Sequence, residues 1–311
     1  MVRFMATKHE IAEEIMKARN SAQDTVRRKY IKELADFTGR DILIYCTAYS
    51  TPKAAGLPSN AISIVQDDMQ GFMTAMHGLN NDKLDIIIHS PGGSSEAVEQ
   101  IMNYLRTKYS NIRAIVPQCA MSAATMLACA CDEIIMGKHS CLGPIDPQLT
   151  FPMQNGSPFT APAHSLLSEF ELAKQEILTT PATAPLWIPK LQSWPPGILD
   201  ICNKTIRLAK TKVASWLETF MFKGEVDANA KSSSIADWLG TFDNHLTHAH
   251  PISYNEALSK GLKVTLLEKE QEFQEKVLSV FHASIVTIVV TNCVKLIENQ
   301  NGIGVFTQVS R

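Results

Sequence analysis

LDIIIHSPGG, residues 84–93, is the segment from which the architecture of this chain is most clearly predicted. Residues 84–89 form a short, mostly apolar run bounded by polar residues, which is typical of a strand buried on both faces. A turn with two glycines follows at once. Residues 94–109 then predict a helix, because a serine can cap its N-terminus and Glu96 stands in its first turn. The rest of the fold can be extended from this strand–turn–helix unit.

The same alternation continues on both sides of the unit. Further short strands are predicted at 41–46, 61–65, 111–116 and 133–136, and a buried helix of small apolar residues at 121–131. Strands that alternate with helices predict an α/β fold with right-handed crossovers. We expect a single domain with its core at about 40–266, an N-terminal helix at 8–38 and a C-terminal helix at 267–301.

Composition narrows the class of protein. The chain has 311 residues, a net charge of −2 and 45% hydrophobic residues, and its 29 basic residues are balanced by 31 acidic ones. These values exclude a disordered chain and leave no electrostatic footprint for nucleic acid. Met1–Phe4 lacks the apolar region of a signal peptide, and the apolar run 285–290 is far shorter than the roughly 20 residues of a membrane helix. We therefore expect no membrane span. Because the seven cysteines are odd in number and scattered, we expect a reducing, cytoplasmic location.

Gly92 and Gly93 make the turn after the strand 84–89 a candidate binding or catalytic segment. Glycines permit positive φ angles and a close approach of the backbone to another group. Their N–H groups, beside a helix N-terminus, can bind an anion or a developing oxyanion. The segment is not GxGxxG and has no phosphate-loop lysine, which disfavours nucleotide binding. The alternative is an ordinary tight turn.

Two further segments place a polar residue where the chain turns. Ser122 stands at the start of the helix 121–131 among small residues, so its hydroxyl is exposed and the next N–H can serve as an oxyanion donor. A helix-capping serine is the alternative. Asp146 lies within LGPIDPQ, residues 142–148, where two prolines fix its direction. The alternative for Asp146 is a surface turn.

His248 and His250 form a third polar segment, before a short helix predicted at 253–261. Two histidines at this spacing could be bases or ligands. Neither an HExxH pattern nor paired CxxC motifs accompany them, so no metal and no cofactor is expected. Two loop histidines with no special role are the alternative. The pair Cys129 and Cys131 is interpreted as core packing.

In chain order, these segments resemble a known family. SPGG after a strand, AMSA before a helix, DEIIM and LGPIDPQ together resemble the serine dehydrogenase-type proteinase family, which is similar to signal peptide peptidase A and, more distantly, to the Clp protease proteolytic subunit. LGPIDPQ is the most specific of these motifs. The resemblance spans about residues 40–148, returns weakly at 198–208 and 247–264, and includes ENQNG at 298–302. It implies the crotonase-like superhelix of ββα units.

The resemblance also implies an activity and its residues. Ser122 is similar to the nucleophile of a serine endopeptidase that cleaves peptide bonds through an acyl-enzyme. The N–H groups of Gly93 and Ala123 would form the oxyanion hole, with Gly92 in the same substrate-binding turn. One departure is Ala124, where the family usually has glycine. Alanine is still small enough for a close backbone approach.

The resemblance leaves the general base open between two arrangements. Signal peptide peptidases use a lysine, and the candidates are Lys204 on a helix predicted at 198–222, then Lys174, then His164 in place of a lysine. A solvated helix face is the alternative for Lys204. Clp-type enzymes use histidine and aspartate instead.

In the Clp-type arrangement, Asp146 falls near the position of the Clp histidine. His248 would then supply the base, giving a triad with Ser122 in which the two roles are exchanged along the chain. The geometry of a triad matters more than its chain order, so the exchange is physically allowed.

The sequence is also compatible with two other classes of function. The same fold can hold acyl-CoA, whose thioester enolate would use the same two N–H donors, although no glutamate pattern for that chemistry is evident. It can also serve as a non-catalytic oligomeric scaffold. By resemblance, we expect a homo-oligomer, such as a trimer, hexamer or ring, with protein or peptide substrates.

Overall fold

The computed structural model describes residue 11 and residues 22–152 and 158–309. Its centre is a seven-stranded sheet with the order β10-β5-β3-β2-β1-β11-β12. The strands are β1 (Asp41–Thr47), β2 (Lys83–His89), β3 (Asn111–Val116), β5 (Glu133–Met136), β10 (Val264–Leu266), β11 (Cys293–Asn299) and β12 (Gly304–Gln308). The first five named are parallel, whereas β11 runs antiparallel to β1 and β12 antiparallel to β11. The central strand is β2, and its residues 84–89 are buried as predicted.

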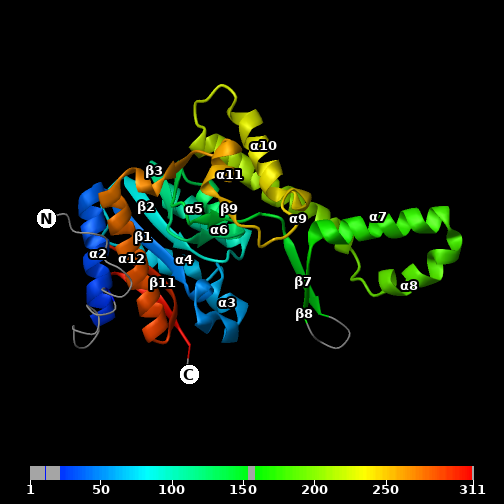
Figure 1. Ribbon diagram of the computed structural model, residues 1–311, viewed down its shortest axis with the longest axis horizontal. Helices are drawn as coiled ribbons and strands as arrows, with labels where there is room; N and C mark the ends of the chain where they lie inside the picture. Colours follow the sequence, from blue (N-terminus) through cyan, green and yellow to red (C-terminus); the bar gives the residue numbers. More distant parts are fainter. Residues whose placement is uncertain (1–10, 12–21, 153–157, 310–311) are drawn as a thin grey trace.

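Helices cover both faces of this sheet. On one face α2 (Ala22–Thr38) and α12 (Gln271–Val290) lie side by side, as Figure 1 shows at its left. On the other face lie α4 (Asp68–Ala75), α5 (Ser95–Arg106) and α6 (Ala123–Cys129). Alternate side chains of β1 enter the two cores, Ile42 on the α2 side and Leu43 on the α5 side. Burial on both faces explains why the strands read as continuous apolar runs.

The remaining helices and strands are additional to the seven-stranded sheet and the five helices named above. They are α3 (Ser59–Ile62), β4 (Cys119–Ala120), β6 (Cys141–Leu142), β7 (Gln148–Pro152), β8 (Pro158–Pro162), α7 (Ala163–Thr179), α8 (Ala184–Gln192), α9 (Ile198–Trp216), α10 (Ala228–Gly240), β9 (Ile252–Ser253) and α11 (Tyr254–Ser259). Short 3-10 or π turns occupy Ala48–Ser50, Pro52–Gly56, Pro181–Thr183, Leu217–Met221, Phe242–Asn244 and Leu267–Lys269. In Figure 1 the hairpin β7–β8 and the helices α7 and α8 extend away from the sheet.

The predicted C-terminal helix at 267–301 is wrong beyond its first part. The helix α12 ends at Val290, and 293–299 is a fully buried strand paired with β1. The strand sequence CVKLIEN mixes apolar residues with Lys295, Glu298 and Asn299, so neither a continuous apolar run nor a strict alternation marks it as a strand. The core therefore extends to residue 308 instead of ending near 266. Of the predicted helix at 8–38, α2 accounts for 22–38, and 8–10 and 12–21 lie outside the described residues.

Other local predictions also need correction. Residues 59–62 are helical, and of the predicted strand at 61–65 Ile64 makes a single bridge to Gly93. Residues 148–152 and 158–162, whose prolines and polar residues are typical of a loop, form the hairpin β7–β8, and 184–192 is helical despite its prolines. These elements depend on pairing and packing partners that a local pattern does not reveal.

The helix α12 is long and apolar enough to cross a membrane by length and composition, and 67% of its most apolar window is buried within the protein. It packs on α2 and on the sheet. Such packing is equally typical of the core helix of a folded domain.

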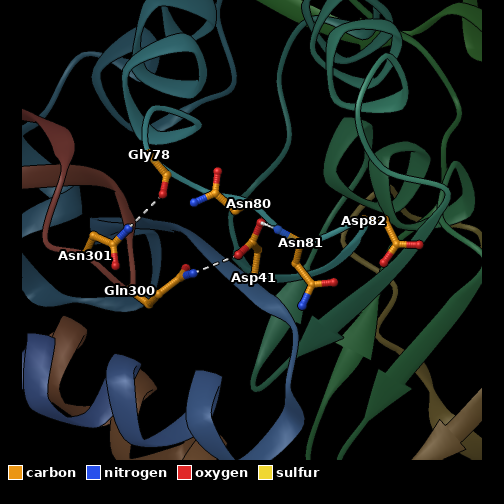
Figure 2. A pocket seen from close by; sticks show the side chains of 7 residues that line it. All are labelled: Asp41, Gly78, Asn80, Asn81, Asp82, Gln300 and Asn301. Carbon is orange, nitrogen blue, oxygen red and sulfur yellow. Dashed lines mark hydrogen bonds between the residues drawn. The ribbon is translucent and has the colours of Figure 1, made fainter.

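A polar hollow of about 640 Å³ lies where β1 begins (Figure 2). Gln300 Nε2 donates to Asp41 Oδ1 at 2.9 Å across it, and Asn301 Nδ2 donates to Gly78 O at 3.3 Å. Because β1 and β2 are parallel, this hollow and the glycine turn after β2 lie at opposite ends of the strands. The hollow is therefore separate from the site described next.

Candidate active site

The glycine turn after β2 is held against two other backbone segments. Gly92 and Gly93 have φ angles of 99° and 146°, which side chains rarely adopt. Ile64 N donates to Gly92 O at 2.7 Å, and Ser94 N donates to Ile64 O at 2.9 Å. A Cβ on Gly93 would lie 2.2 Å from Ile64 O, and one on Gly92 would lie 2.8 Å from Ala123 N. Only glycine fits at either position, and the turn lies directly beside the Ser122 segment.

Ser122 lies in a strained turn at the start of α6. Its φ is 51° and its ψ is −119°, an unusual conformation for a residue with a side chain. Backbone strain of this kind costs about 1–3 kcal/mol and is concentrated at functional sites. Ser122 occupies the N-cap position of α6, but its side chain makes no capping hydrogen bond, and among the described residues its hydroxyl has no hydrogen-bond partner. The serine hydroxyl therefore does not serve as the helix cap.

Two backbone donors flank this serine. Within the described part of the chain, neither the Gly93 N–H nor the Ala123 N–H has an acceptor. Ala123 is the first residue of α6, where orphan N–H groups and the helix dipole favour negative charge. The two donors predicted for an oxyanion hole are thus free and belong to turns in mutual contact.

A small sheet brings the three polar segments to one place. β6 pairs in parallel with β4 and antiparallel with β9, which aligns Ala120, Leu142 and Ile252. Ser122 follows β4 and Asp146 follows β6, whereas His248 precedes the antiparallel β9. All three residues therefore lie beyond the same end of this sheet.

Thr125 fixes the LGPIDPQ loop on α6. Its hydroxyl accepts from Gly143 N at 2.9 Å, and its single proton lies within reach of Ala120 O at 2.7 Å and Gly143 O at 2.8 Å. Gly143 packs directly on Met121, because a Cβ there would lie 3.2 Å from the Met121 Cα atom. The sequence analysis did not single out Thr125.

Asp146 and His248 are hydrogen-bonded. His248 Nδ1 lies 2.8 Å from Asp146 Oδ1, and Gln148 Nε2 donates to Asp146 Oδ2 at 2.7 Å. Asp146 is buried, so the alternative of a surface turn is wrong for it, whereas the His248 side chain keeps 30% of its surface exposed. With Nδ1 bonded to a carboxylate, Nε2 is the nitrogen left to interact with substrate or nucleophile. Gln148, the last residue of LGPIDPQ, is a partner that the sequence analysis missed.

The other candidates for the base lie in different surroundings. Lys204 is 64% exposed on α9 and pairs with Asp200 at 2.7 Å, and Lys174 pairs with Glu171 at 3.1 Å on an exposed face of α7. These lysines are solvated ion-pair partners. A lysine that acts as a general base near neutral pH needs burial, because burial removes the solvation of its charged form and so lowers its pKa.

His164 is the second residue of α7. The first residue of this helix, Ala163, donates its N–H to Pro147 O in the LGPIDPQ loop at 2.9 Å. Burial lowers the pKa of His164, an effect strengthened by Lys210 and opposed by the charge of Asp146. Its Nδ1 atom is buried and has no hydrogen-bond partner among the described residues. The structure thus brings both His164 and His248 toward Asp146, but bonds only His248 to it.

The strained Ser122, two free backbone N–H groups and a histidine–aspartate pair thus lie beyond one end of the small sheet of an α/β fold. The chain belongs to the ClpP-like SDH-type serine proteinase family, whose profile matches residues 12–172, more than half of the chain. This confirms the resemblance drawn from SPGG, AMSA and LGPIDPQ, and with it the ClpP-like fold. The family supports a serine-protease kind of activity.

Individual proteins are also similar to this chain. Uncharacterized protein MJ0137 of Methanocaldococcus jannaschii is 28% identical over 76% of this chain and 73% of its own length. Uncharacterized protein MJ1495 of the same organism is 30% identical over 40% of this chain and 42% of its own length. Among solved structures, two mutants of the 1510-N membrane-bound stomatin-specific protease are similar. They have 18% and 19% identity and TM-scores of 0.38 and 0.36, and the matches cover 69% and 65% of this chain and 79% and 70% of theirs.

Proposed function

We propose that this protein is a serine endopeptidase in which Ser122 is the nucleophile, His248 the general base and Asp146 the residue that orients the histidine. The observation that carries the proposal is the 2.8 Å hydrogen bond between His248 Nδ1 and Asp146 Oδ1. It forms beyond the end of the small sheet where Ser122 also lies. A base oriented by a third group next to a strained serine is the general pattern of an activated nucleophile.

The reaction follows from these positions. Ser122 Oγ attacks the carbonyl carbon of the scissile peptide bond while its proton passes to His248 Nε2. The tetrahedral intermediate then collapses, the C–N bond breaks, and the imidazolium returns the proton to the leaving amine. Water, deprotonated by the same nitrogen, then attacks the Ser122 ester. Collapse of the second tetrahedral intermediate breaks the ester C–O bond, returns the proton from His248 Nε2 to Ser122 Oγ and releases the acid product. Asp146 stabilises the imidazolium in both halves and does not itself take up the proton.

The two free N–H groups would bind the oxyanion of both intermediates. Gly93 and Ala123 contribute backbone donors, which need no reorganisation when negative charge develops. Loss of one such donor costs about 3 kcal/mol in the transition state. The rigid contact of the glycine turn with the Ser122 segment, shown by the crowding at Gly92, supports a preformed hole.

A first experiment separates the peptidase from the other functions that the fold allows. A fluorophosphonate probe should label the wild-type protein, Ser122→Ala should abolish labelling, and casein or peptide cleavage should be lost with it. Ser95→Ala, a nearby helix-terminus serine on α5, is the matched control and should be labelled normally. Labelling that persists in Ser122→Ala would contradict the assignment. A wild-type protein that neither reacts nor cleaves would support a scaffold, and a thermal shift with acyl-CoA would support an acyl-CoA enzyme.

We propose in addition a cytoplasmic homo-oligomer that acts on protein or peptide substrates, without a membrane span or nucleic acid. The arm formed by α7 and α8 supports oligomerisation, because it carries exposed large apolar side chains at Leu172, Leu178, Leu186 and Ile188. Several large apolar side chains exposed on one arm are a feature of interaction sites. Light scattering should give a mass above that of one chain, and a monomeric mass would contradict the oligomer.

A further inference from the structure

A second cluster of titratable side chains lies next to the His248 segment. It consists of His245, His250 and Glu256, each of which offers one atom able to bind a metal, and these three atoms lie within 4.8 Å of one another. The two histidines flank His248 in sequence, whereas Glu256 belongs to α11. The cluster therefore joins the segment that carries the proposed base to a helix beyond β9.

His245 has the environment of a metal ligand. Its side chain is buried, with 5% of the residue exposed, and Nε2 lies 2.9 Å from Trp238 O. A carbonyl oxygen only accepts, so Nε2 carries the proton and Nδ1 of the neutral ring carries a lone pair. That Nδ1 atom is buried and has no hydrogen-bond partner among the described residues. Metal-binding histidines characteristically donate their other ring N–H to a carbonyl or carboxylate in this way.

His250 and Glu256 are already near metal-binding separations. His250 Nε2 lies 3.2 Å from both carboxylate oxygens of Glu256, and the rings of His245 and His250 have centroids 5.2 Å apart. Tetrahedral zinc with ligand distances of about 2.0–2.1 Å places ligand atoms about 3.3 Å apart. Because His250 and Glu256 are partly exposed, small side-chain rotations can close the remaining gap to His245.

We propose that His245, His250 and Glu256 bind one Zn²⁺ ion, which ties the segment carrying His248 to α11. Two imidazoles and one carboxylate are a donor set that suits zinc, with water in the fourth position. The sequence analysis expected no metal because it considered the spacing of His248 and His250. The proposed ligands are instead His245 and His250, which flank His248 in sequence, and Glu256, which the fold brings beside them. The competing arrangement is a metal-free hydrogen-bonded pair of His250 and Glu256 beside a neutral His245.

The test is zinc binding to the full-length protein after treatment with a chelator. Calorimetry should show one Zn²⁺ per chain, and Co²⁺ in its place should give the visible absorption of a tetrahedral site. His250→Gln and Glu256→Gln should each weaken binding by at least about 100-fold. His139→Gln is the matched control, because His139 lies 3.9 Å from Glu268 in a separate histidine–glutamate pair, and it should bind zinc as wild type does.

Thermal unfolding and hydrogen exchange separate lost zinc binding from lost folding. Thermal unfolding without zinc should be the same for the wild type and both variants, which shows that any lost binding is not lost folding. Hydrogen exchange at 245–250 should slow when zinc is added to wild type. Absence of stoichiometric binding, binding unchanged in both variants, or exchange unaffected by zinc would overturn the proposal. Ser122→Ala should still bind zinc, so the metal site and the peptidase proposal can fail independently.

Discussion

His248 and Asp146 are joined by a hydrogen bond across 102 positions of sequence, with Nδ1 and Oδ1 2.8 Å apart. The pairing of β6 with β9 makes this contact possible, because it sets the chain before Ile252 beside the chain after Leu142. Asp146 is buried and receives a second hydrogen bond from Gln148. The carboxylate is therefore fixed before any substrate arrives, and the histidine is held by a rigid partner.

Replacing Asp146 by asparagine tests the orienting role. The amide keeps the size of the side chain but cannot stabilise an imidazolium and favours the wrong ring tautomer. We expect kcat/KM for a peptide substrate to fall by about 10³–10⁴-fold, with the fold retained by circular dichroism. A loss smaller than tenfold would show that the base is not oriented by this carboxylate.

Replacing Lys204 by alanine tests the lysine alternative. Lys204 is exposed and bound to Asp200, so its removal should change kcat/KM by less than about twofold and stability by less than about 1 kcal/mol. Asp200→Ala, which removes the other member of the pair, should behave alike. Complete loss of activity in Lys204→Ala alone would instead identify a serine–lysine mechanism.

Replacing Gly93 by alanine tests the glycine turn. The new Cβ would lie 2.2 Å from Ile64 O at a positive φ, so the turn must move and the oxyanion donor with it. We expect the labelling rate of Ser122 to fall by about 10²–10³-fold. The matched control is Gly56→Ala, where nothing lies within 4 Å of the added atom, and its labelling rate should be that of wild type. Equal rates in the two variants would argue against a donor at Gly93.

His89 should make the protein acid-sensitive. Burial lowers the pKa of His89 from 6.5 to about 4. The ring lies 2.8 Å from Ser50 Oγ, 3.4 Å from Cys119 Sγ and against Phe281. Between pH 6.5 and 4 the unfolded chain therefore binds a proton that the native protein excludes.

The free energy of unfolding should thus be fully retained above about pH 6.5. It should decline as the pH falls, with about 3 kcal/mol lost by pH 4 from this group. Urea unfolding at several pH values measures the slope. His89→Gln should show a shallower decline, and identical slopes for the two proteins would contradict the prediction.

The sequence predicted the parts of the fold that depend on local pattern. The 84–89 strand, the glycine turn and the helix that follows were readable because buried parallel strands are continuously apolar and helix caps have characteristic residues. The strand 293–299 could not be predicted, since Lys295 and Glu298 interrupt its apolar residues and only its pairing with β1 defines it. The motif ENQNG became interpretable in the structure, where Glu298 pairs with the buried Arg27 at 2.7 Å.

The sequence predicted the individual candidate residues of the site, but it did not decide which of them is the general base. Ser122 and Gly93 stand in recognisable turns, whereas Lys204 and His248 could be ranked only after their surroundings were known. Exposure of a lysine and a hydrogen bond across 102 residues are properties of the tertiary fold. Gln148 lay within the most specific motif, but nothing local indicates that its amide binds the aspartate.

Activation of Ser122 by His248 sets the rate at which a fluorophosphonate labels the serine, so this rate measures the activation. Mass spectrometry should locate the label on Ser122 in the wild-type protein. We predict that His248→Gln slows labelling by at least about 10³-fold, whereas His164→Gln, the other histidine near Asp146, stays within about twofold of wild type. Wild-type labelling of Ser122 in His248→Gln would contradict the account.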